Sequence, residues 1–261
     1  MDLELKGKRT LVTGASAGLG AAAANALAAE GAEVIINSRS EERLIATAES
    51  IHAATGVRPQ ILAGDLSHES DLDMICEYAS EAGLDILVSN TGGPPPGKLL
   101  DLGRKTWDNA FDLLLRPAVR LTRSVIEGMI ERKYGRLIYI TSVAVLQPVD
   151  DLMLSNTYRA GVTGFCKTVS NNHARFGITA NCVCPGYTAT KRLKDLAKKR
   201  AEAEGKSVDN VLAAFASLSP AGRLGRPEEL ASLIAFLASK RAAYITGCSI
   251  PVDGGANKAL I

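Results

Sequence analysis

Short apolar runs alternate with longer segments of helical periodicity along most of this chain. The runs that predict buried strands lie at residues 9–12, 34–36, 58–62, 86–88, 136–140, 179–183 and 249–252. Between them lie segments that predict helices, such as the alanine-rich stretch 19–30, which ends at the helix-stopping residue Gly31. Strands that alternate with helices pair in parallel through right-handed crossovers. The sequence therefore predicts an α/β fold with a doubly wound parallel sheet.

One segment interrupts this rhythm. Residues 191–218 are charged and helical and fall between two strand-forming regions, which predicts a helical excursion near the C-terminal edge of the sheet, on its substrate side. The rest contains no linker, repeat or low-complexity tract, and a length of 261 residues suits one large α/β domain. We therefore expect residues 1–261 to form a single domain.

Composition and charge narrow the classes of partner. The formal net charge is only +2, which gives no general electrostatic reason to bind nucleic acid or a membrane surface. No basic stretch followed by an apolar run marks a signal peptide, and no apolar run approaches the roughly 20 residues of a membrane span. The five cysteines lack the spacing of a metal site. We expect a cytoplasmic protein that binds neither metal, membrane nor nucleic acid.

A glycine-rich turn follows the first predicted strand and opens the next helix. Residues 13–20 read Thr-Gly-Ala-Ser-Ala-Gly-Leu-Gly, with glycines at Gly14, Gly18 and Gly20. Glycines permit a tight turn and let backbone amides approach a diphosphate, which a helix N-terminus favours electrostatically. In this strand–turn–helix context the segment predicts a dinucleotide site, which we expect to include Ser16 and Leu19.

The ends of the next strands carry the residues expected to select and hold the cofactor. No acidic residue ends the second strand to bind a ribose diol, and Arg39 follows it, which favours the 2′-phosphate of NADP over NAD. The alternative is that Arg39 is simply solvated at the start of a loop. Asp65 and Leu66 follow the third strand, where a carboxylate can accept a hydrogen bond from adenine. Asn90 and Gly92 follow the fourth strand, where small residues allow the backbone to approach the ribose.

Taken together, these segments resemble the short-chain dehydrogenase/reductase family, in its 3-oxoacyl-(acyl-carrier-protein) reductase-like branch. The likeness runs from about residue 5 to residue 255 and implies a Rossmann fold and an NADP-dependent oxidoreductase. Further matches lie at residues 89–92, 184–190, 225–229, 245–247 and 252–255. Within the second of these, the Pro-Gly-x-x-x-Thr segment of the family implies contacts with the nicotinamide end from Pro185, Gly186, Thr188 and Thr190.

The catalytic residues of that family are an asparagine, a serine, a tyrosine and a lysine, and this chain departs from three of them. The serine is present as Ser142, after the fifth strand. The family's Tyr-x-x-x-Lys motif reads Ser155-x-x-x-Arg159, and the asparagine position falls at Leu114. The resemblance implies that the serine polarises the carbonyl oxygen, the tyrosine supplies the proton and the lysine holds the ribose.

The changed residues leave the proton donor open. Arg159 keeps a positive charge that can bind the ribose, but it does not exchange protons at neutral pH. Ser155 can relay a hydrogen bond but is a far poorer acid than a phenol, and loss of a tuned general acid typically costs roughly 10²–10⁴ in rate. Tyr158, on the same helix, is a candidate substitute, and an ordered water is another. The alternative for Tyr158 is that it packs in a helix contact between subunits.

Two functions from different classes remain. The first is an NADP-dependent oxidoreductase acting on a small-molecule carbonyl or secondary alcohol, with an acyl thioester as one candidate. The alternative is an NADP-binding sensor or assembly protein that has lost turnover, since binding requires none of the altered residues.

The basic residues of 191–200 can attract a phosphopantetheine or a carboxylate, or can form a solvated helix face. The loop 92–97 can shape a pocket wall or serve as a connector.

The resemblance also implies a homo-oligomer, a dimer or a tetramer. Relatives assemble through the helix region that corresponds to residues 157–176 and through the last strand. We expect Phe165 and the apolar end Leu260–Ile261 to suit such interfaces.

Overall fold

Seven parallel strands form one sheet in the computed structural model, which describes residues 2–259. The strands run in the order β3-β2-β1-β4-β5-β6-β7. Their bounds are β1 (Arg9–Val12), β2 (Glu33–Ser38), β3 (Gln60–Ala63), β4 (Ile86–Ser89), β5 (Gly135–Ile140), β6 (Ile178–Pro185) and β7 (Ser249–Val252). The predicted doubly wound parallel sheet is confirmed.

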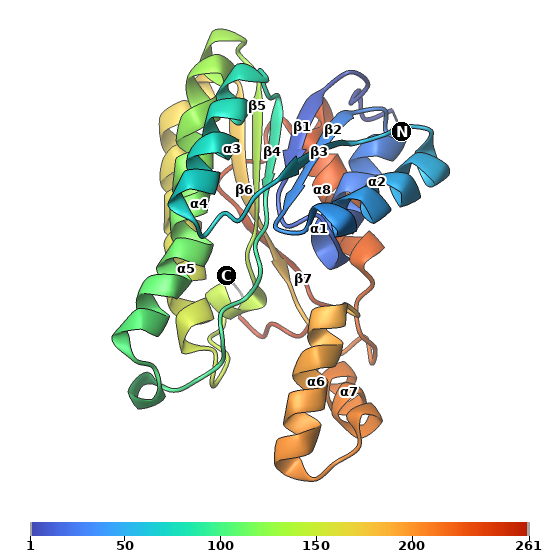
Figure 1. Cartoon of the computed structure of the whole chain (residues 1–261), viewed down its shortest axis with the longest axis vertical. Coiled ribbons are helices and arrows are strands. Elements are labelled where there is room, and N and C mark those ends of the chain that lie inside the picture. Colours follow the sequence, from blue (N-terminus) through green and yellow to red (C-terminus); the bar gives the residue numbers. More distant parts are fainter. Residues whose placement is uncertain (1, 260–261) are drawn as a thin grey trace.

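Helices cover both faces of this sheet (Figure 1). One face carries α1 (Gly18–Ala29), α2 (Glu41–Thr55) and α8 (Pro227–Ala238). The other carries α3 (Glu69–Glu81), α4 (Arg104–Glu131) and α5 (Met153–His173). Successive side chains of a strand point to opposite faces, so Val12 and Ile36 are buried under the first set of helices and Leu11 and Ile35 under the second. Because both faces are covered, the strands read as continuous apolar runs.

The predicted excursion consists of α6 (Lys191–Glu204) and α7 (Val208–Ser217). The two helices project beyond the carboxyl ends of the strands, as the orange segment of Figure 1 shows. They bury a small apolar core of their own, made of Leu193, Ala197, Ala201, Val211 and Phe215. The side chain of Thr190 caps α6 by accepting a hydrogen bond of 3.3 Å from the backbone N–H of Leu193. The start of α6 is therefore held close to the end of β6.

The strands extend further into polar sequence than their apolar patterns predict. Strand β2 continues to Ser38, since Asn37 pairs with Leu62 and Ser38 with Ala63 of β3. Strand β6 continues to Pro185, where it pairs with Val252. The addition to β2 places the polar residues Asn37 and Ser38 at the carboxyl edge of the sheet, where ligands bind in open α/β folds.

The residues expected at subunit interfaces lie partly inside and partly outside the described residues. Phe165 is half-buried and packs edge-to-face on Tyr139, with 6.1 Å between ring centroids, and its place in an interface stays a prediction. Leu260 and Ile261 lie outside the described residues.

Within the part of the chain that the structure describes, no helix combines the length and apolar character needed to cross a membrane.

Candidate functional site

The turn after β1 is locked to the loop after β4. The hydroxyl of Thr13 donates to the carbonyl oxygen of Asn90 at 2.7 Å, and the backbone N–H of Asn90 donates to that hydroxyl at 2.8 Å. The side-chain amide of Asn90 donates to the carbonyl oxygen of Gly14 at 3.2 Å. Gly14 has a φ of +57°, and a Cβ there would lie 2.7 Å from Asn90 Nδ2. The close approach of the two loops therefore requires glycine at this position.

The other glycines of the turn leave the start of α1 open to a ligand. Gly18 has a φ of +58°, and a Cβ on Gly20 would lie 2.4 Å from the carbonyl oxygen of Gly14. Ala17, at the N-cap of α1, offers no side-chain hydrogen bond, and the first turn contains no acidic residue. The first N–H groups of α1 thus keep the partial positive charge that favours a diphosphate.

A cleft of about 380 Å³ continues from this turn along the carboxyl ends of β2, β3 and β4. Arg39, which is 78% exposed, lies at one end with its Nη1 3.7 Å from Asp65 Oδ2. Burial alone raises the pKa of Asp65, but hydrogen bonds from Ser67 and the charge of Arg39 outweigh that effect and hold the pKa below its ordinary value. Asp65 is thus an ionised hydrogen-bond acceptor at neutral pH.

Buried polar atoms in this cleft lack partners. Ser38 Oγ and Asn37 Oδ1 are buried and make no hydrogen bond within residues 2–259. Both residues line the cleft, together with Arg39 and Arg43. Buried polar atoms are nearly always hydrogen-bonded, so these two fit a polar ligand. Two cationic side chains beside them fit a phosphate on the adenosine ribose, and hence NADP.

The loop after β6 closes on the glycine turn. The methyl group of Thr190 lies 3.4 Å from the position that a Cβ on Gly18 would occupy. Gly186 is tightly packed, since a Cβ there would lie 2.7 Å from the Cβ of Asp253, and its N–H donates to the carbonyl oxygen of Val252 at 3.0 Å. Thr190 therefore lies beside the start of α1, and the contacts of Pro185, Gly186, Thr188 and Thr190 with the nicotinamide end stay a prediction.

Other residues expected at the cofactor differ in where their side chains lie. Ser16, Leu66 and Gly92 line the cleft, and Leu66 is buried. Leu19 belongs to the first turn of α1, but its side chain packs against the apolar core under α1. Only the backbone of Leu19 therefore remains as a candidate ligand.

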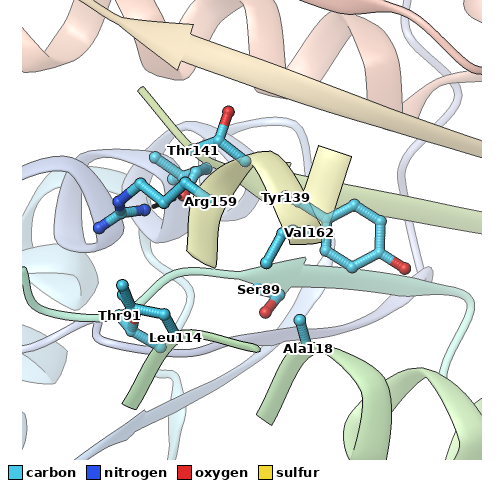
Figure 2. Close-up of a pocket in the computed structure, with 9 residues that line it drawn as sticks. Ser89, Thr91, Leu114, Ala118, Tyr139, Thr141, Arg159 and Val162 are labelled. Atoms are coloured by element: carbon cyan, nitrogen blue, oxygen red, sulfur yellow. Dashed lines mark hydrogen bonds between the residues drawn. The ribbon is translucent and has the colours of Figure 1, made fainter. Parts of the chain in front are cut away.

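The guanidinium of Arg159 is fixed between two loops. Its Nη1 donates to the carbonyl oxygen of Ile140 at 2.9 Å, and its Nη2 donates to that of Gly92 at 3.2 Å. Figure 2 shows this side chain extending toward the side of the pocket where Thr91 lies. Burial and, to a smaller extent, the positive charge of Arg192 lower the pKa of Arg159 to about 10. Arg159 therefore remains a cation at neutral pH.

Ser142 follows the strand end that Arg159 binds, and Ser155 lies on the same helix as Arg159. Ser142 is half-buried two residues after Ile140, and its hydroxyl accepts a hydrogen bond of 3.1 Å from the N–H of Ala144. Ser155, also half-buried, lies on α5 four residues before Arg159 and thus on the same face of that helix. The structure records no hydrogen bond of the Ser155 side chain within residues 2–259, so its hydroxyl is available to a ligand or to solvent.

Leu114 places a hydrocarbon where the family's asparagine would stand. It is buried and lines one small pocket with Ser89, Thr91 and Arg159 (Figure 2). An alkyl side chain neither donates nor accepts a hydrogen bond. The water relay that depends on the asparagine side chain is therefore not available at this position.

Tyr158 packs against α4. Its ring meets Trp107 edge-to-face, with centroids 5.9 Å apart, and Phe111 at 6.1 Å. Burial raises the pKa of Tyr158, and the charges of Asp108 and Asp112 raise it further. Its recorded contacts are with α4 and not with Ser142 or Arg159. Both features argue against this hydroxyl as the proton donor.

Sequence reasoning missed one arginine and one serine, and it gave a second arginine only a general role. Arg43 lies in the first turn of α2 and lines the cleft, and its place near the start of the helix after the second strand could have identified it. The unpaired hydroxyl of Ser38 has no sequence signal, because it depends on how far β2 extends. Arg192 lies across the cleft over Gly93, a position that depends on how α6 packs.

Comparisons with known proteins agree with this geometry. The family described as enoyl-(acyl carrier protein) reductase matches residues 14–257. The chain is 34% identical over 255 residues to the 3-oxoacyl-(acyl-carrier-protein) reductase of Vibrio cholerae serotype O1, covering 97% of this chain and 98% of that protein. The solved structure of L-sorbose reductase from Gluconobacter frateurii, complexed with NADPH and L-sorbose, matches with a TM-score of 0.94 and 33% identity over 100% of both chains. That of a 3-oxoacyl (acyl-carrier-protein) reductase from Agrobacterium tumefaciens C58, with NADP bound, matches with a TM-score of 0.88 and 30% identity, covering 97% of this chain and 96% of that one.

Proposed function

Because the chain belongs to the short-chain dehydrogenase/reductase family, in its 3-oxoacyl-(acyl-carrier-protein) reductase-like branch, and is an NADP-dependent oxidoreductase, we propose that it interconverts a small-molecule carbonyl and its secondary alcohol through an atypical proton route. One observation carries this proposal. The Arg159 guanidinium is fixed to Ile140 and Gly92 at the position of the family's lysine, with no phenol one helical turn before it. The site thus retains a fixed positive charge but lacks the usual acid.

The proposed roles follow from what each group can do. When bound, NADPH supplies the hydride from its nicotinamide ring. The Ser142 hydroxyl donates a hydrogen bond to the carbonyl oxygen of the substrate, which polarises the carbonyl group. The Arg159 cation holds the ribose and stabilises negative charge as it develops on that oxygen. A fixed cation does this without reorganisation during the reaction.

Ser155 is the proposed route for the proton. It lies on the Arg159 face of α5, and its hydroxyl has both a donor and acceptors, so it can pass a proton from solvent to the substrate oxygen. It is not itself an acid at neutral pH, and we therefore expect a slower chemical step than a phenol would give. Leu114 cannot take part, and Tyr158 is committed to α4.

We assign the adenosine end of NADP to the cleft between β2 and α2. Arg39 and Arg43 supply positive charge for the 2′-phosphate, and the Ser38 hydroxyl gains the hydrogen bond that it lacks. Asp65 accepts a hydrogen bond from adenine, and the open start of α1 binds the diphosphate.

The substrate and the assembly are proposed more broadly. The relative from Vibrio cholerae is named for a 3-oxoacyl thioester and the structure from Gluconobacter contains a ketose, so either class of carbonyl is a candidate.

We also propose a homo-oligomer that pairs α4 and α5 between subunits. Phe111, which is 40% exposed, lies beside Tyr158 on this surface and would gain burial there.

The test is NADPH oxidation with ketones, aldehydes and 3-oxoacyl thioesters, on protein first shown to bind NADPH. We expect substrate-dependent oxidation that Ser142→Ala reduces by about 10²–10³-fold while the Kd for NADPH is unchanged. Turnover that is equal in Ser142→Ala would refute the site. Tight NADPH binding without turnover across the whole panel would instead favour a sensor or an assembly protein.

A further inference from the structure

Two guanidinium groups converge on consecutive residues of the loop after β4. Arg159 reaches it from α5 and donates to the carbonyl oxygen of Gly92 at 3.2 Å. Arg192 reaches it from α6 and donates from Nη2 to the carbonyl oxygen of Pro94 at 3.3 Å. Arg192 also lies so close over Gly93 that a Cβ there would be 2.2 Å from its Nη2. The two cations therefore flank a loop segment of only three residues.

Neither cation is neutralised within residues 2–259. No ion pair joins Arg159 or Arg192 to a carboxylate, and their recorded hydrogen bonds go to backbone carbonyl groups. Burial lowers the pKa of Arg192, and the charge of Asp195, one turn along α6, opposes this effect only in part and makes no ion pair with it. The charge of Arg192 is felt at Arg159, whose pKa it lowers after the larger effect of burial. Such repulsion is relieved when an anion binds between the two groups.

Arg192 lines the cofactor cleft, and its contacts lie on the loop after β4, which leads from the glycine turn toward α5. The loop begins at Asn90, which is bound to the glycine turn, and ends at Gly97, whose N–H donates to the carbonyl oxygen of Asp151 at 2.7 Å. Gly97 also pairs with Leu152, three residues before Ser155. Arg192 contacts Gly93 and Pro94 in the middle of this loop. The loop runs from the glycine turn toward α5, the helix that carries Ser155 and Arg159.

We propose that Arg192, acting with Arg159, binds an anionic group, a carboxylate or a phosphate, on the carbonyl substrate. The guanidinium fork matches both groups in two-point hydrogen bonding, and Arg192 is exposed, so an incoming substrate can reach it. This inference rests on the proposed function and narrows its substrate class to charged carbonyl compounds. Arg192 is a specificity residue in this scheme, because it binds a part of the substrate that does not react.

Matched probes that differ in one charge test the proposal. They are 2-oxobutanoate and 3-oxobutanoate, each against its methyl ester, and dihydroxyacetone phosphate against dihydroxyacetone. We expect the wild type to prefer the charged member of at least one pair in kcat/KM. Arg192→Gln should reduce that preference about 10- to 100-fold by acting on the charged member alone, which is the effect of losing a charge-assisted hydrogen bond. The pair that responds distinguishes carboxylate from phosphate.

Two further variants serve as controls. Arg192→Lys keeps the charge but not the fork and should retain part of the preference. Lys206→Gln removes an equal charge from an exposed residue beyond the far end of α6 and should change nothing. The proposal is overturned if Arg192→Gln affects charged and uncharged members equally, if it weakens NADPH binding by the same factor, or if the wild type prefers no charged member.

A binding measurement separates this proposal from the proposed function. Calorimetric titration of the charged and uncharged probes into the wild type loaded with NADP⁺ requires no turnover. Tighter binding of a charged probe that Arg192→Gln removes would support the anion site even if no probe were reduced. Equal, weak binding of both members of every pair would overturn the anion site while leaving carbonyl reduction to the activity assay.

Discussion

Replacing Arg159 with methionine tests the electrostatic part of the mechanism. Methionine has a similar reach but carries no charge and donates no hydrogen bond, so Arg159→Met removes the contacts to Ile140 and Gly92 together. Arg159→Lys keeps the charge and loses the fork. Lys167→Met serves as the matched control, because it removes a charge from an exposed residue two helical turns along the same helix.

The expected magnitudes follow from the two contacts. Ile140 is buried, so its carbonyl oxygen loses a donor that water does not readily replace, at a cost of about 1–3 kcal/mol in the free energy of unfolding. Water can replace the donor at the more exposed Gly92 end. Loss of one fixed donor from the site of developing negative charge costs about 10²–10³ in kcat. We expect Arg159→Met to show both losses and Arg159→Lys to lose roughly tenfold in kcat, since the charge remains but is less well positioned.

Steady-state NADPH oxidation and urea unfolding measure the two effects separately. Unfolding shows whether a variant is folded under the conditions of the rate assay, so that a loss of rate is not a loss of protein. A folded Arg159→Met enzyme with kcat within threefold of the wild type would refute the reasoning. An equal loss in Lys167→Met would show that net charge, rather than position, matters.

Three further predictions concern the cofactor and the proton donor. Arg39→Leu should raise the Kd for NADPH about 10- to 100-fold without changing that for NADH, measured by fluorescence titration; an equal effect on both would show that Arg39 does not recognise the 2′-phosphate. Gly14→Ala forces a Cβ toward Asn90 at positive φ and should lower the free energy of unfolding by about 1–3 kcal/mol and weaken NADPH binding; urea unfolding that matches the wild type would contradict the close approach of the loops. Tyr158→Phe keeps the ring contacts with α4 and should leave kcat unchanged in the NADPH oxidation assay, whereas a drop of tenfold or more would make Tyr158 the proton donor.

The fold could be predicted because its signals are local. Most strands are apolar runs, glycines mark several of the turns, and parallel pairing follows from the alternation of strands with helices. The ends of the strands were less predictable, since β2 continues through Asn37 and Ser38 only because β3 lies beside them. The contacts of a polar strand end are tertiary, and a single sequence does not encode them in any short pattern.

In the candidate site, too, some residues could be identified from the sequence, whereas their tertiary contacts could not. The positions of Ser155 and Arg159 follow from the resemblance of the motif, whereas the contacts of Arg159 with Ile140 and Gly92 are visible only in the structure. Tyr158 was a candidate donor because spacing alone does not show that Trp107 and Phe111 of α4 surround its ring. Arg192 had only a general role as part of a basic helix, since its contact with Gly93 depends on the packing of the whole excursion.

The pH dependence of kcat is the most direct test of a reaction without an ionising acid. Serine hydroxyls do not titrate in this range, and Arg159, with a pKa lowered to about 10 by burial and by Arg192, stays charged below that pH. The account predicts a kcat that is constant from about pH 6 to about pH 9 and falls as pH rises through about 10, where Arg159 loses its proton. A profile with a midpoint near neutrality that Arg159→Lys leaves in place would reveal an ionising proton donor and contradict the account.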